Sequence, residues 1–189
     1  MSRPARRSTG VDRATLGLVA LGVALLIGRA WLPTLGPAGP VAGGASVLLA
    51  ILVGSLVVPA HPGPARIRPV VVLAIGLAAI ALASAAAGPP VRTPYASWAL
   101  PLALLAAVAE EALFRRAAYG ALERHGALVA VGLTALAFVL VHVPLYGVTA
   151  FPVDLGAGLL LSWQRWASGT WTVPAATHAA ANLLMTVMR

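Results

Sequence analysis

Long apolar runs, each close to 20 residues and separated by short segments rich in proline, glycine or arginine, constrain this chain more than any other feature. A helix of about 20 residues spans the hydrocarbon core of a bilayer. The chain is 60% hydrophobic and only 10% charged, with a mean hydropathy of +0.91, which lies far from the balance of a soluble domain. We therefore expect an all-α, polytopic transmembrane helical bundle.

The breaks between the apolar runs divide the chain into about seven predicted spans. In order, these spans are 14–32, 41–60, 69–87, 96–122, 127–146, 151–166 and 170–188. Prolines and glycines cluster in the first three gaps, where they interrupt helices. We group the chain into a basic cytoplasmic N-terminus (1–13), three N-terminal transmembrane helices (14–95) and a four-helix core (96–189) that carries the candidate site residues.

Arginine supplies all of the basic charge, since the chain has no lysine and a formal net charge of +8. The arginines lie between apolar runs and do not form a basic stripe with interleaved aromatic residues, so we expect a lipid bilayer and no nucleic acid as a partner. If the N-terminus is cytoplasmic, ten arginines fall on the inner side: Arg3, Arg6, Arg7, Arg13, Arg66, Arg68, Arg115, Arg116, Arg124 and Arg165. The positive-inside rule favours this orientation. The absence of cysteine excludes disulfides, a thiolate nucleophile and a cysteine zinc site.

Two adjacent glutamates, Glu110 and Glu111, follow a long apolar run within the fourth predicted span. Ionised groups at that depth are unfavourable unless they have partners. Side chains four residues apart share a helix face, so Glu111 is expected to pair with Arg115, while Glu110 faces another direction. Glu110 is therefore the candidate base. The alternative is that both glutamates only mark the helix end at the interface, paired with Arg115 or Arg116.

His142 closes the fifth predicted span, four residues after Phe138 on the same face. The charged turn before this span lies about midway between Glu110 and His142, so an antiparallel hairpin would bring both to a similar depth. In the last span, His178 and Asn182 are one helical turn apart. Such a polar pair can simply hold helices together. Three helices that bury two carboxylates, two imidazoles and an amide nevertheless favour a functional site.

These three patterns, in this order, resemble the motifs of the CPBP family (Abi, CAAX protease and bacteriocin-processing proteins). They are Glu-Glu-x-x-x-Arg ending at Arg115, Phe-x-x-x-His ending at His142 and His-x-x-x-Asn ending at Asn182. The resemblance covers about residues 98–188. It implies an intramembrane endopeptidase whose active site lies within the bilayer.

The mechanism implied by the resemblance gives Glu110, helped by His142, the role of activating a water molecule that attacks a peptide carbonyl. His178 and Asn182 would then hold the developing oxyanion. A carboxylate near an imidazole suits general-base work, and donors fixed on one helix face suit an oxyanion. Three further residues are given supporting roles: Glu111, Arg115 and Phe138.

A mechanism that uses a metal ion is the alternative to this one. Glu110, His142 and His178 could form a zinc site with an open position for water. Because His-Glu-x-x-His is absent and Asn182 is a poor zinc ligand, we favour a metal-free glutamate mechanism without a cofactor.

The expected substrate is a membrane-associated protein or peptide. It would be a prenylated or otherwise tethered C-terminal segment, or a sorting tail of a bacterial surface protein as in the myxosortase-like members of the family. The expected location is the inner membrane of a bacterium. Two alternatives stay open: a non-catalytic bacteriocin-immunity or scaffold protein that uses the polar cluster for packing, and a proton or ion carrier.

The remaining polar residues near the spans are given structural interpretations. Arg29, Arg92 and Arg189 lie near outer ends, where we expect their side chains to snorkel to the interface. Ser162 and Gln164 are assigned no role.

Overall fold

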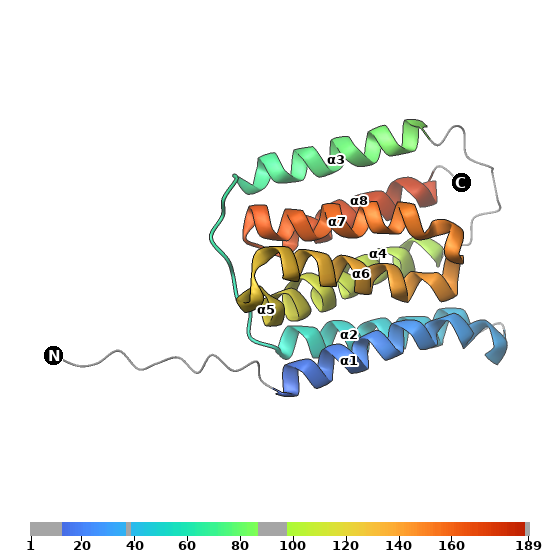
Figure 1. The fold of residues 1–189 in the computed structure, drawn as a ribbon. Coiled ribbons are helices and arrows are strands. Elements are labelled where there is room, and N and C mark those ends of the chain that lie inside the picture. Colours follow the sequence, from blue (N-terminus) through green and yellow to red (C-terminus); the bar gives the residue numbers. More distant parts are fainter. Residues whose placement is uncertain (1–12, 37–38, 87–97, 188–189) are drawn as a thin grey trace.

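A computed structural model of the chain describes residues 13–36, 39–86 and 98–187. Within these ranges the chain is almost entirely helical and contains no β-strand. Seven helical spans alternate in direction (Figure 1), so the chain is an all-α helical membrane protein, as the sequence predicts. Most of the basic N-terminus, as well as Arg92 and Arg189, lies outside the described residues.

The helices follow the predicted spans to within a few residues. The first three are α1 (Arg13–Gly28), α2 (Gly44–Val57) and α3 (Pro69–Ala86). The fourth span is one continuous helical path made of α4 (Ala99–Glu111), η3 (Ala112–Ala118) and α5 (Tyr119–Leu122). The last three are α6 (Ala127–Tyr146), α7 (Phe151–Ser168) and α8 (Thr172–Val187). Short turns extend or join them: η1 (Arg29–Leu35), η2 (Gly39–Gly43), η4 (Glu123–His125) and η5 (Val148–Ala150).

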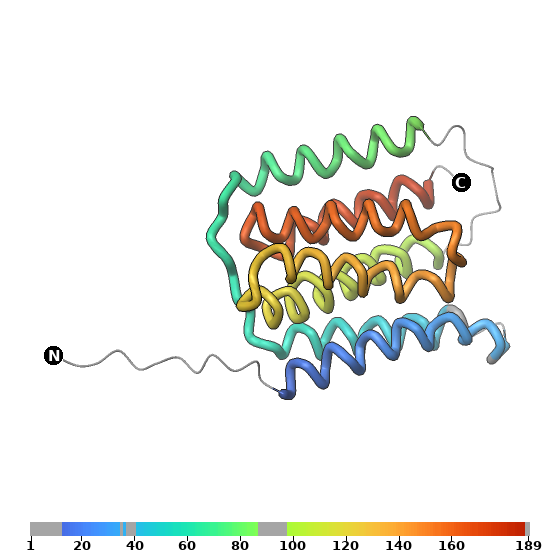
Figure 2. Tube along the Cα trace, viewed as in Figure 1, coloured from blue at the N-terminus to red at the C-terminus, as the bar shows by residue number. Residues whose placement is uncertain are grey.

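The four C-terminal spans form the centre of the bundle, and the first three helices cover it from two sides. α6 packs on α7, and α4 packs on α8. α1 and α2 lie together against α4 and α6, whereas α3 lies on the opposite side against α7 and α8 (Figures 1 and 2). The main apolar core therefore joins α1 and α2 to the central helices, through side chains such as Leu26, Leu48, Leu113 and Phe138.

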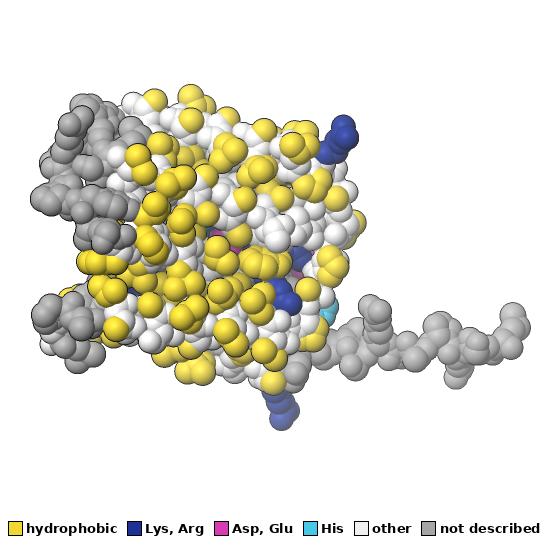
Figure 3. Space-filling model, turned by 180° about the vertical axis from the view of Figure 1, so that it is seen from behind, with side chains coloured by type: hydrophobic (Ala, Val, Ile, Leu, Met, Phe, Trp, Pro, Cys, Tyr) yellow, Lys and Arg dark blue, Asp and Glu magenta, His cyan; other side chains and the backbone are white. Residues whose placement is uncertain are grey.

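The outer surface is apolar enough to face lipid. Three helical stretches are both long and apolar enough to cross a membrane: Arg13–Thr34, Pro69–Ala86 and Ala127–Tyr146. The fourth span carries two glutamates and two arginines, Glu110, Glu111, Arg115 and Arg116, which lower its hydropathy. In Figure 3 apolar side chains are spread over the whole visible face, and the arginine atoms lie mainly toward one end. The total of seven membrane crossings stays a prediction.

Polar side chains to which the sequence assigned no role hold helices together. Ser162 Oγ lies 3.0 Å from Thr134 Oγ1, which links α7 to α6. Gln164 Nε2 donates to the carbonyl of Val72 at 3.0 Å and to Thr177 Oγ1 at 2.9 Å, so one amide joins α7 to α3 and α8. Hydrogen bonds of this kind satisfy polar groups that lipid cannot satisfy.

The fourth span changes its winding directly after the paired glutamates. From Ala112 to Ala118 the backbone is π-helical, and the amide of Tyr119 donates to the carbonyl of Phe114, five residues earlier. Short π-helical segments inside α-helices are frequent at functional sites. Here the segment carries Arg115, which reaches back to Glu111.

Candidate active site

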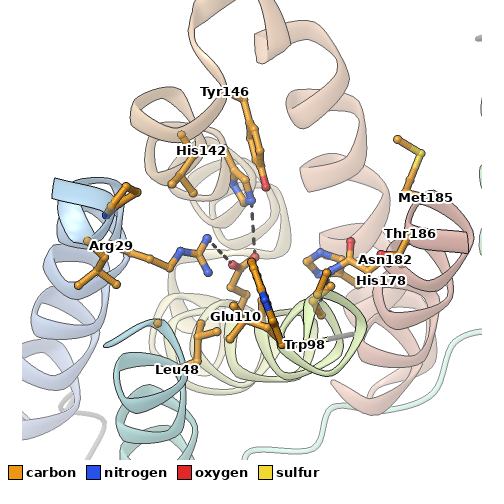
Figure 4. Close-up of a pocket in the computed structure, with 18 residues that line it drawn as sticks. Arg29, Leu48, Trp98, Glu110, His142, Tyr146, His178, Asn182, Met185 and Thr186 are labelled. Atoms are coloured by element: carbon orange, nitrogen blue, oxygen red, sulfur yellow. Dashed lines mark hydrogen bonds and ion pairs between the residues drawn. The ribbon is translucent and has the colours of Figure 1, made fainter. Parts of the chain in front are cut away.

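A cavity of about 360 Å³ opens among η1, α2, α4, α6 and α8. All four residues predicted to be catalytic line it: Glu110, His142, His178 and Asn182. In Figure 4 the side chains of Arg29 and His142 point toward Glu110, and those of His178 and Asn182 approach from α8. The remainder of the wall is mostly apolar, with leucines from several helices.

Glu110 holds the centre of this arrangement between a guanidinium and an imidazole. Its Oε1 lies 3.1 Å from Arg29 Nη2, and its Oε2 lies 3.6 Å from His142 Nε2. The glutamate is only 2% exposed. A carboxylate this deeply buried needs a partner charge, and Arg29 supplies it.

The orientation of the His142 ring follows from its other nitrogen. Nδ1 lies 2.7 Å from the carbonyl oxygen of Phe138. Because a carbonyl only accepts, Nδ1 is the donor, and Nε2 of the neutral ring is left as an acceptor that faces Glu110. The ring packs on Phe138 with centroids 4.3 Å apart and stacks on Tyr146 at 5.6 Å.

Glu111 belongs to a second, more deeply buried cluster. Its Oε1 accepts from Arg115 Nη1 at 2.9 Å, as the spacing of four residues predicts, and from His178 Nδ1 at 3.0 Å. Arg115 is fully buried and also donates from Nη2 to the carbonyl of Gly158 at 3.0 Å. This cluster connects α4 to α7 and α8, and it fixes the direction of the His178 ring.

Phe138 packs against members of both clusters. Its ring centroid lies 5.6 Å from that of His178, and the Arg115 guanidinium carbon lies 4.9 Å from the ring. Its backbone carbonyl holds His142. One residue thus contacts both imidazoles, and the supporting role given to Phe138 stays a prediction.

Asn182 is held through its amide nitrogen. Nδ2 donates to the carbonyl of Ala103 at 2.8 Å, which ties α8 to α4 beside the cavity. A carboxamide has a second hydrogen and an oxygen in addition. The predicted oxyanion role of Asn182 stays a prediction.

One family comparison matches this region of the chain. A family model described as type II CAAX prenyl endopeptidase, Rce1-like, matches residues 92–184. The chain belongs to the CPBP (CAAX protease) family. No curated protein and no solved structure was found to match it. The family match begins just before α4 and ends within α8, so it covers the central helices of this CAAX protease family member.

The expectation for Arg29 was wrong. The sequence predicts that this arginine snorkels to the interface, whereas the structure places it in the cavity wall, with 14% of its side chain exposed and Glu110 as its partner. A signal existed: once Glu111 is paired with Arg115, Glu110 still needs a counter-charge, and Arg29 is an ionisable residue inside a predicted span. Arg29 lies outside the part of the CPBP chain that the family model matches.

The residues proposed for a zinc site do not fit one as they stand. Among the described residues of this CPBP protein, no group of three or more His, Cys, Asp and Glu side chains could hold a metal ion. His178 directs Nδ1 to Glu111, and Arg29 already occupies one face of the Glu110 carboxylate. We therefore derive no chemical step through a metal.

Proposed function

We propose that this CAAX protease family member is an intramembrane endopeptidase of the glutamate type, with Glu110 as the general base. The observation that carries the proposal is the position of Glu110, which is buried between Arg29 and His142 in the wall of a cavity. Helix packing alone gives little reason for a carboxylate at this position. A carboxylate there is, however, suited to remove a proton from water.

The proposed reaction begins with one water molecule in contact with both Glu110 Oε2 and His142 Nε2, two acceptor atoms 3.6 Å apart. Water that donates to both atoms has its oxygen lone pair free to attack a peptide carbonyl carbon. As the new C–O bond forms, the water proton passes to Glu110. Glu110 then gives this proton to the leaving nitrogen, and the C–N bond breaks as the tetrahedral oxyanion collapses. The products are a carboxylic acid and an amine, and transfer of the second water proton from the acid to the amine gives a carboxylate and an ammonium group.

The developing oxyanion is proposed to lie toward α8. His178 Nδ1 donates to Glu111, so Nε2 of His178 offers a hydrogen only when the ring is an imidazolium. The second amide hydrogen of Asn182 is the other candidate donor, because the first one goes to Ala103.

The proposed substrate is a peptide segment that is tethered to the membrane or lies near the C-terminus of a protein. The mostly apolar cavity wall supports this proposal, as does the location of the site within the apolar helices. Prenylated tails and bacterial sorting tails both belong to this class. The proposed location is the inner membrane of a bacterium with the N-terminus in the cytoplasm, and the distribution of arginine supports that orientation.

The test is cleavage of candidate membrane-tethered peptides by the purified full chain in proteoliposomes. Glu110→Gln keeps the shape of the side chain but removes the base, so cleavage should fall about 10²- to 10⁴-fold. Glu123→Gln is the matched control, because this glutamate lies in the α5–α6 turn and does not line the cavity. If both variants cleave like the wild type, Glu110 is not the base.

The same pair of variants separates the other functions. A scaffold or immunity protein would keep its protective phenotype in cells that produce Glu110→Gln. A proton or ion carrier would show flux across proteoliposomes without any peptide. Flux that depends on Glu110, together with absence of cleavage, would replace the protease proposal.

A further inference from the structure

The cavity opens at one end of the bundle. Besides the polar residues, it is lined by residues where helices begin or end, among them Pro33, Gly44, Trp98, Tyr146 and Thr186. Because neighbouring helices are antiparallel, the ends of α1, α6 and α8 lie beside the beginnings of α2 and α4 (Figure 1). We call this the cavity end of the bundle.

The arginines occupy the opposite end. Among the described residues, the exposed arginines are Arg13, Arg66, Arg68 and Arg124. They lie at the start of α1, in the α2–α3 connection and in the α5–α6 turn, which all belong to the end away from the cavity. We call this the arginine end.

Arg29 does not weaken the unequal distribution of exposed arginines between the two ends. It is the one described arginine at the cavity end, and its guanidinium faces Glu110 inside the bundle. It therefore does not act as a flanking charge toward lipid phosphates. In the sequence, Arg3, Arg6 and Arg7 precede α1, which starts at the arginine end, whereas Arg92 and Arg189 follow helices that end at the cavity end.

Short loops rich in arginine stay on the cytoplasmic side of a membrane, where they also meet anionic lipids. We propose that the Glu110 cavity opens to the extracytoplasmic side, so that this enzyme cleaves membrane-tethered segments of exported proteins. The statement about exported substrates rests on the proposed proteolytic function. The statement about the side to which the cavity opens depends only on the arrangement of helices and arginines.

A place in a reaction sequence follows. A segment that enters from the outer side must first have been moved across the membrane, so translocation of the substrate precedes its hydrolysis. The cavity of about 360 Å³ is at the small end of the range for binding pockets. It accommodates a few residues around the cleaved bond and not a folded domain.

The side of opening can be measured without any substrate, because the chain has no cysteine. Val148→Cys places a thiol in η5 at the cavity end, where the native side chain is 72% exposed. His125→Cys places one in η4 at the arginine end. A membrane-impermeant maleimide, added to cells with a permeabilised outer membrane, should label Val148→Cys. It should label His125→Cys only after the inner membrane is opened.

A second set of variants tests the cavity itself and guards against one unreactive thiol. Met185 lines the cavity and is 51% exposed, so Met185→Cys should be labelled from outside. Ala65→Cys, in the exposed α2–α3 connection, should be protected in the same cells. Labelling of the arginine-end thiols from outside, or equal labelling of both ends, overturns the inference.

Peptide cleavage then separates this inference from the proposed function. Two tethered reporters carry the same cleavable segment, one directed across the inner membrane and one retained in the cytoplasm. Glu110-dependent cleavage of the exported reporter alone is the expected result, and cleavage of the cytoplasmic reporter alone overturns the inference while it leaves the protease intact. If the thiols label as expected but purified protein cleaves no peptide, the protease proposal fails and the outward opening stands.

Discussion

Arg29 Nη2 lies 3.1 Å from Glu110 Oε1, across the boundary between η1 and the central helices. The guanidinium comes from a part of the chain that the family model does not match. The pair draws the N-terminal helices into the site, because the carboxylate that we propose as base receives its counter-charge from outside the four-helix core. The N-terminal part of the chain therefore supplies the ion-pair partner of the proposed base as well as part of the lipid-facing surface.

Arg29→Gln should lower kcat/KM for peptide cleavage by about 10- to 100-fold, since a hydrogen bond to a charged group is worth about 1.5–3 kcal/mol. Arg29→Lys keeps the charge but loses the planar fork, so it should retain an intermediate rate. Arg68→Gln is the control, because Arg68 is exposed at the arginine end. An equal loss in Arg29→Gln and Arg68→Gln would show that general charge, not the pair with Glu110, matters.

Arg115→Met should be strongly destabilising, because it leaves Glu111 as a buried carboxylate whose remaining partner is His178. Removal of one member of a buried ion pair typically costs about 3–5 kcal/mol. The double variant Glu111→Gln with Arg115→Met removes both charges and should recover part of this loss. The measurement is the free energy of unfolding in mild detergent. A double variant less stable than Arg115→Met would contradict the pairing.

Gly158→Ala should loosen the contact between α6 and α7. A Cβ at this position would come within 3.0 Å of the Ala135 carbonyl oxygen, and the Gly158 carbonyl accepts from Arg115. Overpacking of this kind costs about 1–3 kcal/mol. Gly156→Ala is the matched control, since its Cβ would meet nothing within 4 Å. Thermal unfolding in detergent should separate the two, and equal midpoints would count against the close approach.

Chelators should leave peptide cleavage unchanged if the mechanism runs through Glu110 and water alone. The measurement compares cleavage before and after dialysis against EDTA and 1,10-phenanthroline, followed by addition of zinc. Loss of activity that zinc restores, with metal found in the purified chain, would require a metal mechanism in place of the proposed one.

The sequence predicts the helical path well, because hydrophobic length and helix breakers are local properties. The pair Glu111–Arg115 also follows from spacing alone, and the structure contains it at 2.9 Å. The similar depth of His142 and Glu110 was expected from the similar lengths of chain on both sides of one turn. These features depend on helix geometry and on short connections.

Contacts between helices distant in the sequence could not be predicted in the same way. Nothing local indicates that η1 turns Arg29 toward α4, or that α3 lies across the bundle from α1 and α2. Likewise, the joint hold of Arg115 and His178 on Glu111 depends on how α8 packs against α4. The direction in which the cavity opens could not be predicted either, because it depends on how the ends of five helices lie relative to one another.

The pairing of Glu111 with Arg115 on a single helical span also bears on how the chain enters the bilayer. During synthesis the fourth span is inserted before α8, which brings His178, has been made. A carboxylate and a guanidinium one turn apart form a neutral unit that lipid accepts more readily than two separate ions. The fourth span can therefore stay inserted in the membrane before α8 is made. The complete candidate site forms only once α8, the final described helix, has packed against α4.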